Sequence, residues 1–166
     1  MKFKCTVCGQ EHDTDNISFG AAEPIMWHLI TEKERRASML ASDQCEITSK
    51  EGRSYYIRGC IEIPIKGTQR RFTWGVWCSL SEKNYREMGE HWQDANRMKL
   101  PPYFGWLCTR IPEYPDTAGL KTMVRQRVVG MRPLVELEAT DHPLAVDQRM
   151  GIEAERLQQI ITKLLH

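Results

Sequence analysis

The chain has 166 residues, of which 41% are hydrophobic and 27% charged, a composition that fits one globular domain with its own core. Twenty-three Lys and Arg residues against 22 Asp and Glu leave a net charge of +1, which excludes a global attraction to nucleic acid or to an anionic membrane. No apolar run approaches the roughly 18 residues of a membrane span, and the first residues lack an export signal. We therefore expect a cytoplasmic protein with reduced cysteines.

The first residues of the chain carry the pattern of half a zinc site. Cys5 and Cys8 are separated by two residues, and His12 follows closely. Two thiolates on such a turn can point at one ion, and zinc takes four nitrogen or sulfur ligands. The sequence has no second Cys-x2-Cys pair, so another ligand has to come from further along the chain. The polar surroundings of Cys45 make it the first choice, and Cys60 is the second.

The sequence therefore predicts a structural zinc ion held by Cys5, Cys8, His12 and Cys45. Residues 1–24 would form this metal-binding segment, packed on a single domain that spans residues 1–166. Free thiols on a loose terminus are the plain alternative. A thioredoxin-like redox pair is less favoured, because no helix pattern follows the cysteines to lower a thiol pKa.

The next residues predict loop, helix and then a hairpin. Residues 13–24 are rich in turn formers, and Thr31 with Glu34 has the pattern of a capping box that opens a short helix over about residues 32–40. Alternating apolar residues then predict two paired strands over residues 55–65 and 72–80.

The register of this hairpin follows from its apolar faces. To place both faces on the same side, we expect Ile65 opposite Phe72, and therefore Ile63 opposite Trp74. The same register puts Cys60 opposite Trp77.

The second face of the hairpin is a candidate ligand site. Arg58, Cys60, Glu62 and Trp77 would bring a cation, a thiol, an acid and an aromatic surface together. The plain alternative is that a helix covers this face, that Trp77 packs beneath it, and that Arg58 pairs with Glu62.

Further along the chain, Ser81 is the expected N-cap of a helix of about three turns, and residues 103–108 are expected to form a strand. Residues 120–128 and 134–138 predict a second hairpin. A II′ turn at Gly130 and Met131 would join its strands.

Two helices are expected to complete the chain. Asp141, with Pro143 just inside, predicts the start of a short helix, and apolar residues between Leu157 and Leu165 predict the stripe of a final one.

Two other functions are weighed against a binding role. His142 could act as a general base oriented by Asp141 or Asp147, but no further catalytic motif accompanies it. The basic residues of 121–127, together with tryptophans, could bind nucleic acid. We rank this function third, because the expected register pairs Arg125 with an acidic residue of the next strand.

Several motifs resemble one bacterial family, domain of unknown function 2199, over almost the whole chain. These motifs are Cys5-x2-Cys8-Gly9-x2-His12, "RGCIEIPI", "WGVW" with "SLSE", "PPYFGWLC", "YPDT" and "DHPLAVDQRMGI". The resemblance implies a compact bacterial cytoplasmic domain, and it brings no established reaction, substrate or catalytic residue with it.

Together these observations predict an α+β fold, a mostly antiparallel sheet built from hairpins with flanking helices and an N-terminal zinc-knuckle-like segment. The expected function is a noncatalytic, zinc-stabilised module that binds a protein or a small polar ligand. The alternative is a small hydrolase-like enzyme that uses Cys60 and Glu62, or His142.

Overall fold

Two long strands, β6 (Gly52–Pro64) and β7 (Arg71–Leu80), form the central hairpin of the molecule. The computed structural model describes residues 2–14 and 18–166. It contains both helices and strands, which confirms the α+β class. Within the described residues, none of the helices combines the length and the apolar character that crossing a lipid bilayer requires.

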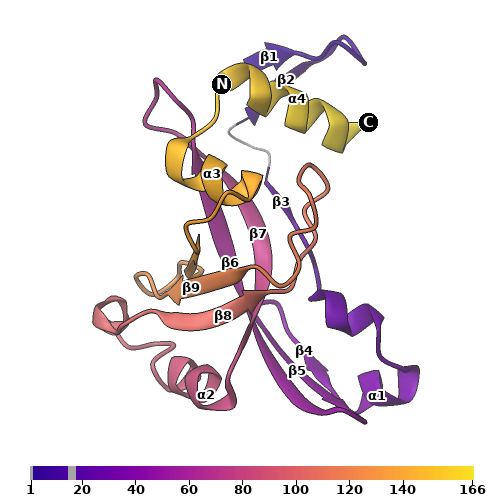
Figure 1. Cartoon of the computed structure of the whole chain (residues 1–166), viewed down its shortest axis with the longest axis vertical. Coiled ribbons are helices and arrows are strands. Elements are labelled where there is room, and N and C mark those ends of the chain that lie inside the picture. Colours follow the sequence, from indigo (N-terminus) through magenta and orange to yellow (C-terminus); the bar gives the residue numbers. More distant parts are fainter. Residues whose placement is uncertain (1, 15–17) are drawn as a thin grey trace.

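The central hairpin closes into a ring of five strands. Figure 1 labels β6, β7, β8 and β9 of this ring near the middle of the view. The ring runs from β7 through β8, β9 and β10 back to β6. The last step is parallel, as is the pairing of β3 on β7, whereas the other pairings are antiparallel. A hairpin joins two antiparallel strands, so these two parallel pairings need longer connections than hairpin turns. The bounds of the ring strands beyond the hairpin are β8 (Tyr103–Leu107), β9 (Lys121–Arg125) and β10 (Leu134–Leu137).

Further strands extend the sheet, and a separate hairpin lies at the top of Figure 1. The extending strands are β3 (Phe19–Gly20), β4 (Met39–Leu40) and β5 (Gln44–Ser49). The separate two-stranded hairpin consists of β1 (Lys2–Lys4) and β2 (Glu11–Asp13). It lies beside helix α4, so the N-terminal and C-terminal parts of the chain meet.

The central hairpin has the predicted faces and a different register. Ile63, not Ile65, lies opposite Phe72, and Arg58 rather than Cys60 lies opposite Trp77. The Ile65 N–H donates to the Arg70 carbonyl over 3.0 Å, and the Thr68 N–H donates to the Ile65 carbonyl, so the turn lies between Ile65 and Arg70 and its centre is one residue earlier than expected. A shift of two residues keeps every side chain on its face.

The second hairpin is shifted in the same way. Arg125 pairs with Leu134 in the ladder, and its side chain still reaches Glu136, with Nε 3.1 Å from Oε1. The predicted II′ turn does not form. Gly130 (φ +91°) instead takes the third position of a turn in which the Met131 N–H donates to Val128.

The helices begin largely where the sequence predicts. α1 has the predicted capping box at Thr31, and α2 is capped by Ser81. His142, not Asp141, caps α3, because its Nδ1 accepts the Leu144 N–H. The helical bounds are α1 (Glu32–Arg36), α2 (Glu82–Glu90), α3 (Pro143–Met150) and α4 (Ala154–Leu165), with short 3-10 turns at Ile25–His28 and Arg97–Lys99. α1 ends early because strand β4 begins at Met39.

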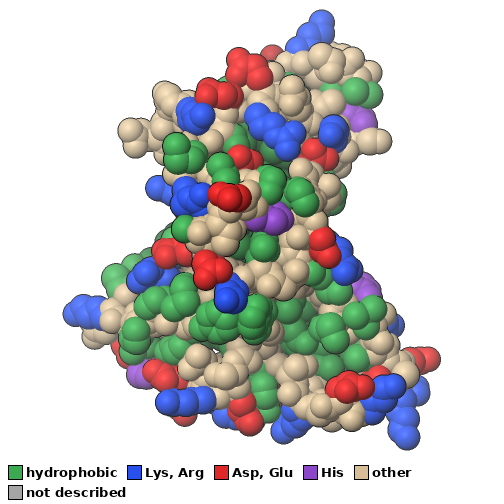
Figure 2. All heavy atoms as spheres, viewed as in Figure 1, with side chains coloured by type: hydrophobic (Ala, Val, Ile, Leu, Met, Phe, Trp, Pro, Cys, Tyr) green, Lys and Arg blue, Asp and Glu red, His purple; other side chains and the backbone are tan. Residues whose placement is uncertain are grey.

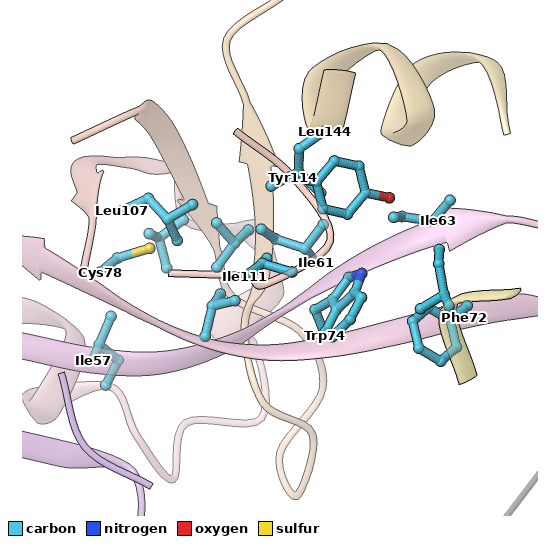
Figure 3. Packing of buried hydrophobic residues seen from close by; sticks show 14 of the residues in the cluster. Ile57, Ile61, Ile63, Phe72, Trp74, Cys78, Leu107, Ile111, Tyr114 and Leu144 are labelled. Atoms are coloured by element: carbon cyan, nitrogen blue, oxygen red, sulfur yellow. The ribbon is translucent and has the colours of Figure 1, made fainter. Parts of the chain in front are cut away.

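The main core lies between the apolar face of the central hairpin and the elements that cover it. Figure 3 shows Ile61 and Trp74 directed towards Leu144 of α3 and towards Tyr114. The apolar stripe of α4 joins this core through Leu157 and its neighbours. Burial of these side chains is the main force that holds α3 and α4 against the sheet.

Candidate metal centre

The β1–β2 hairpin holds its two cysteines on a tight turn. The Cys5 N–H donates to the Gln10 carbonyl over 2.8 Å, and the Gly9 N–H donates to the Cys5 carbonyl over 3.0 Å. Gly9 has φ +72°, a left-handed conformation that favours glycine. The Val7 N–H points at Cys5 Sγ, 3.4 Å away. This turn sets the first thiol in position and returns the chain towards His12.

The hairpin and α4 together assemble a cluster of four ligand atoms. The atoms offered by Cys5, Cys8, His12 and His166 all lie within 4.8 Å of one another. Cys5 Sγ is 3.4 Å from His166 Nε2, and Cys8 Sγ is 3.3 Å from His12 Nε2. Cys5 is buried, whereas Cys8 and His166 are exposed, so the cluster lies at the surface with one anchored ligand.

The packing of α4 explains why a residue so distant in sequence reaches the hairpin. Ile160 and Ile161 of α4 are fully buried in the core, and Phe3 of β1 belongs to the same core cluster. Burial in this shared core brings the last turn of the helix to the hairpin, where Thr162 Oγ1 lies 4.0 Å from Cys5 Sγ. His166 then follows the last residue of α4.

The surroundings of Cys5 favour its thiolate form. Its pKa is lowered to about 6, chiefly by the backbone N–H of Cys8, which donates to the sulfur, while burial acts in the opposite direction. The Val7 N–H lowers the pKa further. Since the thiolate is the form that binds metal, this thiol is prepared to act as a ligand near neutral pH.

Of the predicted ligands, three are brought together and the fourth is replaced. Cys45 is fully buried on β5, where it packs with Ile47 and Trp77. Cys60, the second choice, lies on β6 beside Arg127 and Arg132. Cys45 and Ile47 are two positions apart on β5, so their side chains lie on the same face of the strand. This face is packed, although the residues around Cys45 in sequence are polar.

His166 is the member of the cluster that the sequence does not predict. The spacing between positions 12 and 166 carries no ligand pattern, and only the amphipathic stripe of α4 indicates that this helix packs on the core. Sequence alone could thus predict the helix but not its proximity to the hairpin.

The predicted ligand site on the second face of the central hairpin is divided by the fold. Trp77 is fully buried, its Nε1–H donates to the Ala21 carbonyl over 3.1 Å, and Trp27 and Ile30 pack against the cluster to which it belongs. Trp77 therefore belongs to a second core cluster and cannot contact a ligand. The guanidinium of Arg58 lies over its ring at 5.9 Å.

The other two members of that group face a different neighbourhood. Glu62 is held by Arg127 and lies 3.9 Å from Arg71, so its partner is not Arg58. Cys60 lines a cavity of about 520 Å³ together with Arg127 and Arg132. Burial raises the pKa of the Cys60 thiol, which keeps it protonated.

His142 is the N-cap residue of α3. Its Nδ1 accepts the Leu144 N–H over 3.2 Å, while its Nε2 is buried and has no hydrogen-bond partner among the described residues. Asp147 accepts the hydroxyl hydrogen of Tyr114 over 2.8 Å, so its recorded partner is a tyrosine and not this histidine.

The basic strand is also largely neutralised. Arg125 pairs with Glu136, and Arg127 pairs with Glu62. Of the tryptophans that could stack on bases, Trp74 and Trp77 are buried and Trp106 is exposed.

The fold and the cluster define a class: an α+β domain with a closed ring of strands, whose N-terminal hairpin meets its last helix at a Cys/His group able to hold a metal ion. The chain belongs to the family described as uncharacterized protein conserved in bacteria (DUF2199), whose model matches residues 4–152. The match includes Cys5, Cys8 and His12 and ends before α4. No curated protein and no solved structure matches the chain.

Proposed function

We propose that Cys5, Cys8, His12 and His166 hold one structural zinc ion. The observation that carries this proposal is the convergence of four nitrogen and sulfur atoms within 4.8 Å. A tetrahedral zinc ion with ordinary bond lengths separates a sulfur from a nitrogen ligand by about 3.6 Å. The two sulfur–nitrogen distances of 3.4 and 3.3 Å are close to this value, so the group fits zinc with little rearrangement.

The ligand set favours a structural role over a catalytic one. A catalytic zinc ion keeps one position open for water or substrate, whereas a structural ion is enclosed by four protein ligands. Here the hairpin supplies three ligands and α4 supplies His166. The ion would fasten the hairpin to the body of the domain, a connection that the few apolar residues of the hairpin make only through Phe3 and Cys5.

We further propose that the domain is a noncatalytic binding module for a protein or a small polar ligand. Phe104, Trp106 and Met123 form an exposed apolar patch on the outer face of β8 and β9. Figure 2 shows hydrophobic side chains gathered on the lower half of the same view, where these strands lie. Contiguous exposed patches of this kind are typical of contact surfaces for proteins.

The enzymatic alternative has less support. A cysteine nucleophile needs a lowered pKa, and burial raises the pKa of Cys60. Glu62 is engaged by Arg127, and His142 uses one ring nitrogen to cap a helix. Glu62 and His142 are thus bound to other parts of the protein, whereas a catalytic acid or base has to be free to contact its substrate.

Metal analysis of protein purified without an affinity tag tests the zinc proposal. We expect about one zinc ion per chain under reducing conditions. Cys5→Ser combined with Cys8→Ser should abolish it, while Cys60→Ser combined with Cys108→Ser removes two thiols elsewhere and should leave it unchanged. Metal-free reduced protein, or full zinc content in the first double variant, would contradict the proposal.

A further inference from the structure

A cavity of about 520 Å³ lies between strand β6 and the connection that joins β9 to β10. This volume is within the range of small-molecule sites. Its polar wall contains Asp43, Cys60, Arg97, Arg127 and Arg132. Its apolar wall contains Trp92, Val129 and Met131, of which Val129 and Met131 are exposed. The cavity therefore offers one charged side and one apolar side.

The charges around the cavity do not balance. Arg132 pairs with Asp43, its Nε lying 2.6 Å from Oδ1, and Arg127 pairs with Glu62. Arg97 is only 2% exposed, and within the described chain its guanidinium donates to backbone carbonyls and to no carboxylate. The cavity thus carries an excess positive charge from a buried group, which has little solvent to screen it.

Arg58 adds to this charge from the neighbouring part of β6. Its guanidinium packs over the ring of Trp77, and its Nη1–H donates weakly to the Ser42 carbonyl over 3.4 Å. Its Nε is buried with no hydrogen-bond partner in the described part of the chain. Burial is the main cause that lowers the pKa of Arg58; repulsion from Arg132 acts in the same direction, and attraction to Asp43 acts against it.

Arg127 and Arg132 keep guanidinium hydrogens that no oxygen accepts among the described residues, although the Arg127 side chain also donates to the Cys60 thiol. Arg127 donates from Nε to the Arg132 carbonyl and from Nη1 to Glu62, while Arg132 donates from Nε to Asp43. Neither Nη2 of Arg127 nor the two Nη atoms of Arg132 has an oxygen acceptor among the residues that the structure describes. Planar guanidinium groups bind carboxylate and phosphate oxygens through such donors.

We propose that this cavity binds a small organic anion, whose carboxylate or phosphate group contacts Arg127 and Arg132 and whose apolar part lies against Trp92, Val129 and Met131. The proposal deepens the binding role proposed above by naming a ligand class. It does not depend on the zinc ion, because none of the four metal-cluster residues lines the cavity.

Titration calorimetry with phenyl phosphate, phenylacetate and the neutral analogue 2-phenylethanol tests the proposal. We expect one of the two anions to bind with a stoichiometry of one per chain, and the neutral analogue to bind at least about tenfold more weakly because it cannot engage the arginines. The preferred anion distinguishes a phosphate ligand from a carboxylate ligand. Inorganic phosphate, which lacks the apolar part, should bind more weakly than phenyl phosphate.

Substitutions at the two members of the Arg132–Asp43 pair should change the affinity for the anion in opposite directions. Arg132→Gln should weaken binding of the preferred anion by about tenfold or more. Asp43→Asn should tighten it, because the competing carboxylate on Arg132 is removed. The matched control is Arg110→Gln, which breaks an exposed Arg–Asp pair of the same kind, with Arg110 Nε 3.3 Å from Asp116 Oδ1, and should leave binding unchanged.

Three results would overturn the proposal: no anion binding by the wild-type protein, equal binding of the neutral analogue, or equal losses in Arg132→Gln and Arg110→Gln. If Arg132→Gln does not fold, the tightening expected for Asp43→Asn decides the question. The Cys5→Ser and Cys8→Ser double variant should bind the anion as the wild type does. Failure of the zinc proposal and failure of this one are therefore measured separately.

Discussion

Cys5 Sγ and His166 Nε2 lie 3.4 Å apart, although 161 positions separate the two residues in the chain. One residue belongs to the turn of the β1–β2 hairpin and the other follows α4. Both are placed by apolar contacts to the same core, through Phe3 on one side and Ile161 on the other. The candidate metal centre is therefore a product of tertiary packing.

Replacing His166 tests the contribution of α4 to the metal centre. We expect His166→Ala to lower zinc affinity by about a hundredfold or more, because loss of an outer-shell partner alone commonly costs about 10–100-fold. Competition with a zinc-binding dye measures this affinity. His28→Ala removes an exposed histidine near Glu23 and serves as the control. Equal affinities of the two variants would remove His166 from the ligand set.

Removing the metal should loosen one region and spare another. We expect chelation to increase amide hydrogen exchange in residues 2–14 while β6 and β7 stay protected, because the hairpin has few apolar contacts of its own and the sheet has many. Exchange measured by mass spectrometry with and without chelator resolves the two regions. Loss of protection in β6 would show that the ion supports the whole fold.

Arg97 should be among the most important polar residues for stability. Its guanidinium donates to the carbonyls of Trp92, Arg127, Val128 and Met131 over 2.7–2.9 Å. Arg97→Met leaves these carbonyls without a hydrogen-bond donor, and we expect the free energy of unfolding to fall by about 3 kcal/mol or more. Arg97→Lys should recover part of the loss.

Urea denaturation measures the effect of these Arg97 variants. The control is Arg36→Met, which breaks an exposed pair with Glu32 on α1 and should leave stability nearly unchanged. If Arg97→Met and Arg36→Met cost the same, the buried carbonyls do not depend on this guanidinium.

Stability should decline in alkali, partly through Cys78. Burial raises the pKa of this thiol from about 9 to about 12, so the unfolded chain loses the proton first. The protonated thiol thus contributes fully below pH 9, and its contribution is lost as the pH rises towards 12. Between these values one such group gives a slope of about 1.4 kcal/mol per pH unit.

Unfolding free energies measured over this pH range test the assignment to Cys78. Cys78→Ala should reduce the slope of the unfolding free energy against pH by about 1.4 kcal/mol per pH unit, the contribution of one titrating group. Val76→Ala also removes buried volume from β7 but contains no titratable group, so its slope should equal that of the wild type. An unchanged slope in Cys78→Ala would assign the alkaline loss to other groups, such as the buried tyrosines.

Gly59 is required where β10 closes the ring against β6. A Cβ at this position would lie 2.7 Å from Val135 Cγ2 and 2.9 Å from the Pro133 carbonyl oxygen. We expect Gly59→Ala to cost about 1–3 kcal/mol, because the backbone of the parallel pairing has to move. Gly89→Ala, on the exposed side of α2, should be neutral or slightly stabilising. Thermal unfolding compares the two, and equal stabilities would mean that the closure tolerates a side chain.

The alternation of apolar residues correctly predicted which side of each central strand faces the core. It could not predict the register, because a shift by two residues leaves every side chain on its face. Both hairpins are shifted in this way. In the second hairpin the connection after β9 contacts a residue distant in sequence, because its carbonyls accept hydrogen bonds from the guanidinium of Arg97.

Local motifs were equally informative at short range. The capping box at Thr31, the cap at Ser81 and the Cys5-x2-Cys8 turn each involve residues within a few positions, so their geometry is encoded locally. Cys45, the expected fourth ligand, lies outside this cluster; the expectation depended on its polar neighbours in sequence, which do not report which face of a strand is packed.

The sequence by itself determined the mixed α+β class, the inward faces of the strands, and the grouping of Cys5, Cys8 and His12 on one hairpin. The tertiary structure alone decided that His166 joins them, that Trp77 is covered, and that arginines far apart in sequence meet around one cavity. The physical reason is that periodicity and capping depend on neighbours in the chain, whereas these meetings depend on how buried faces pack across the whole domain.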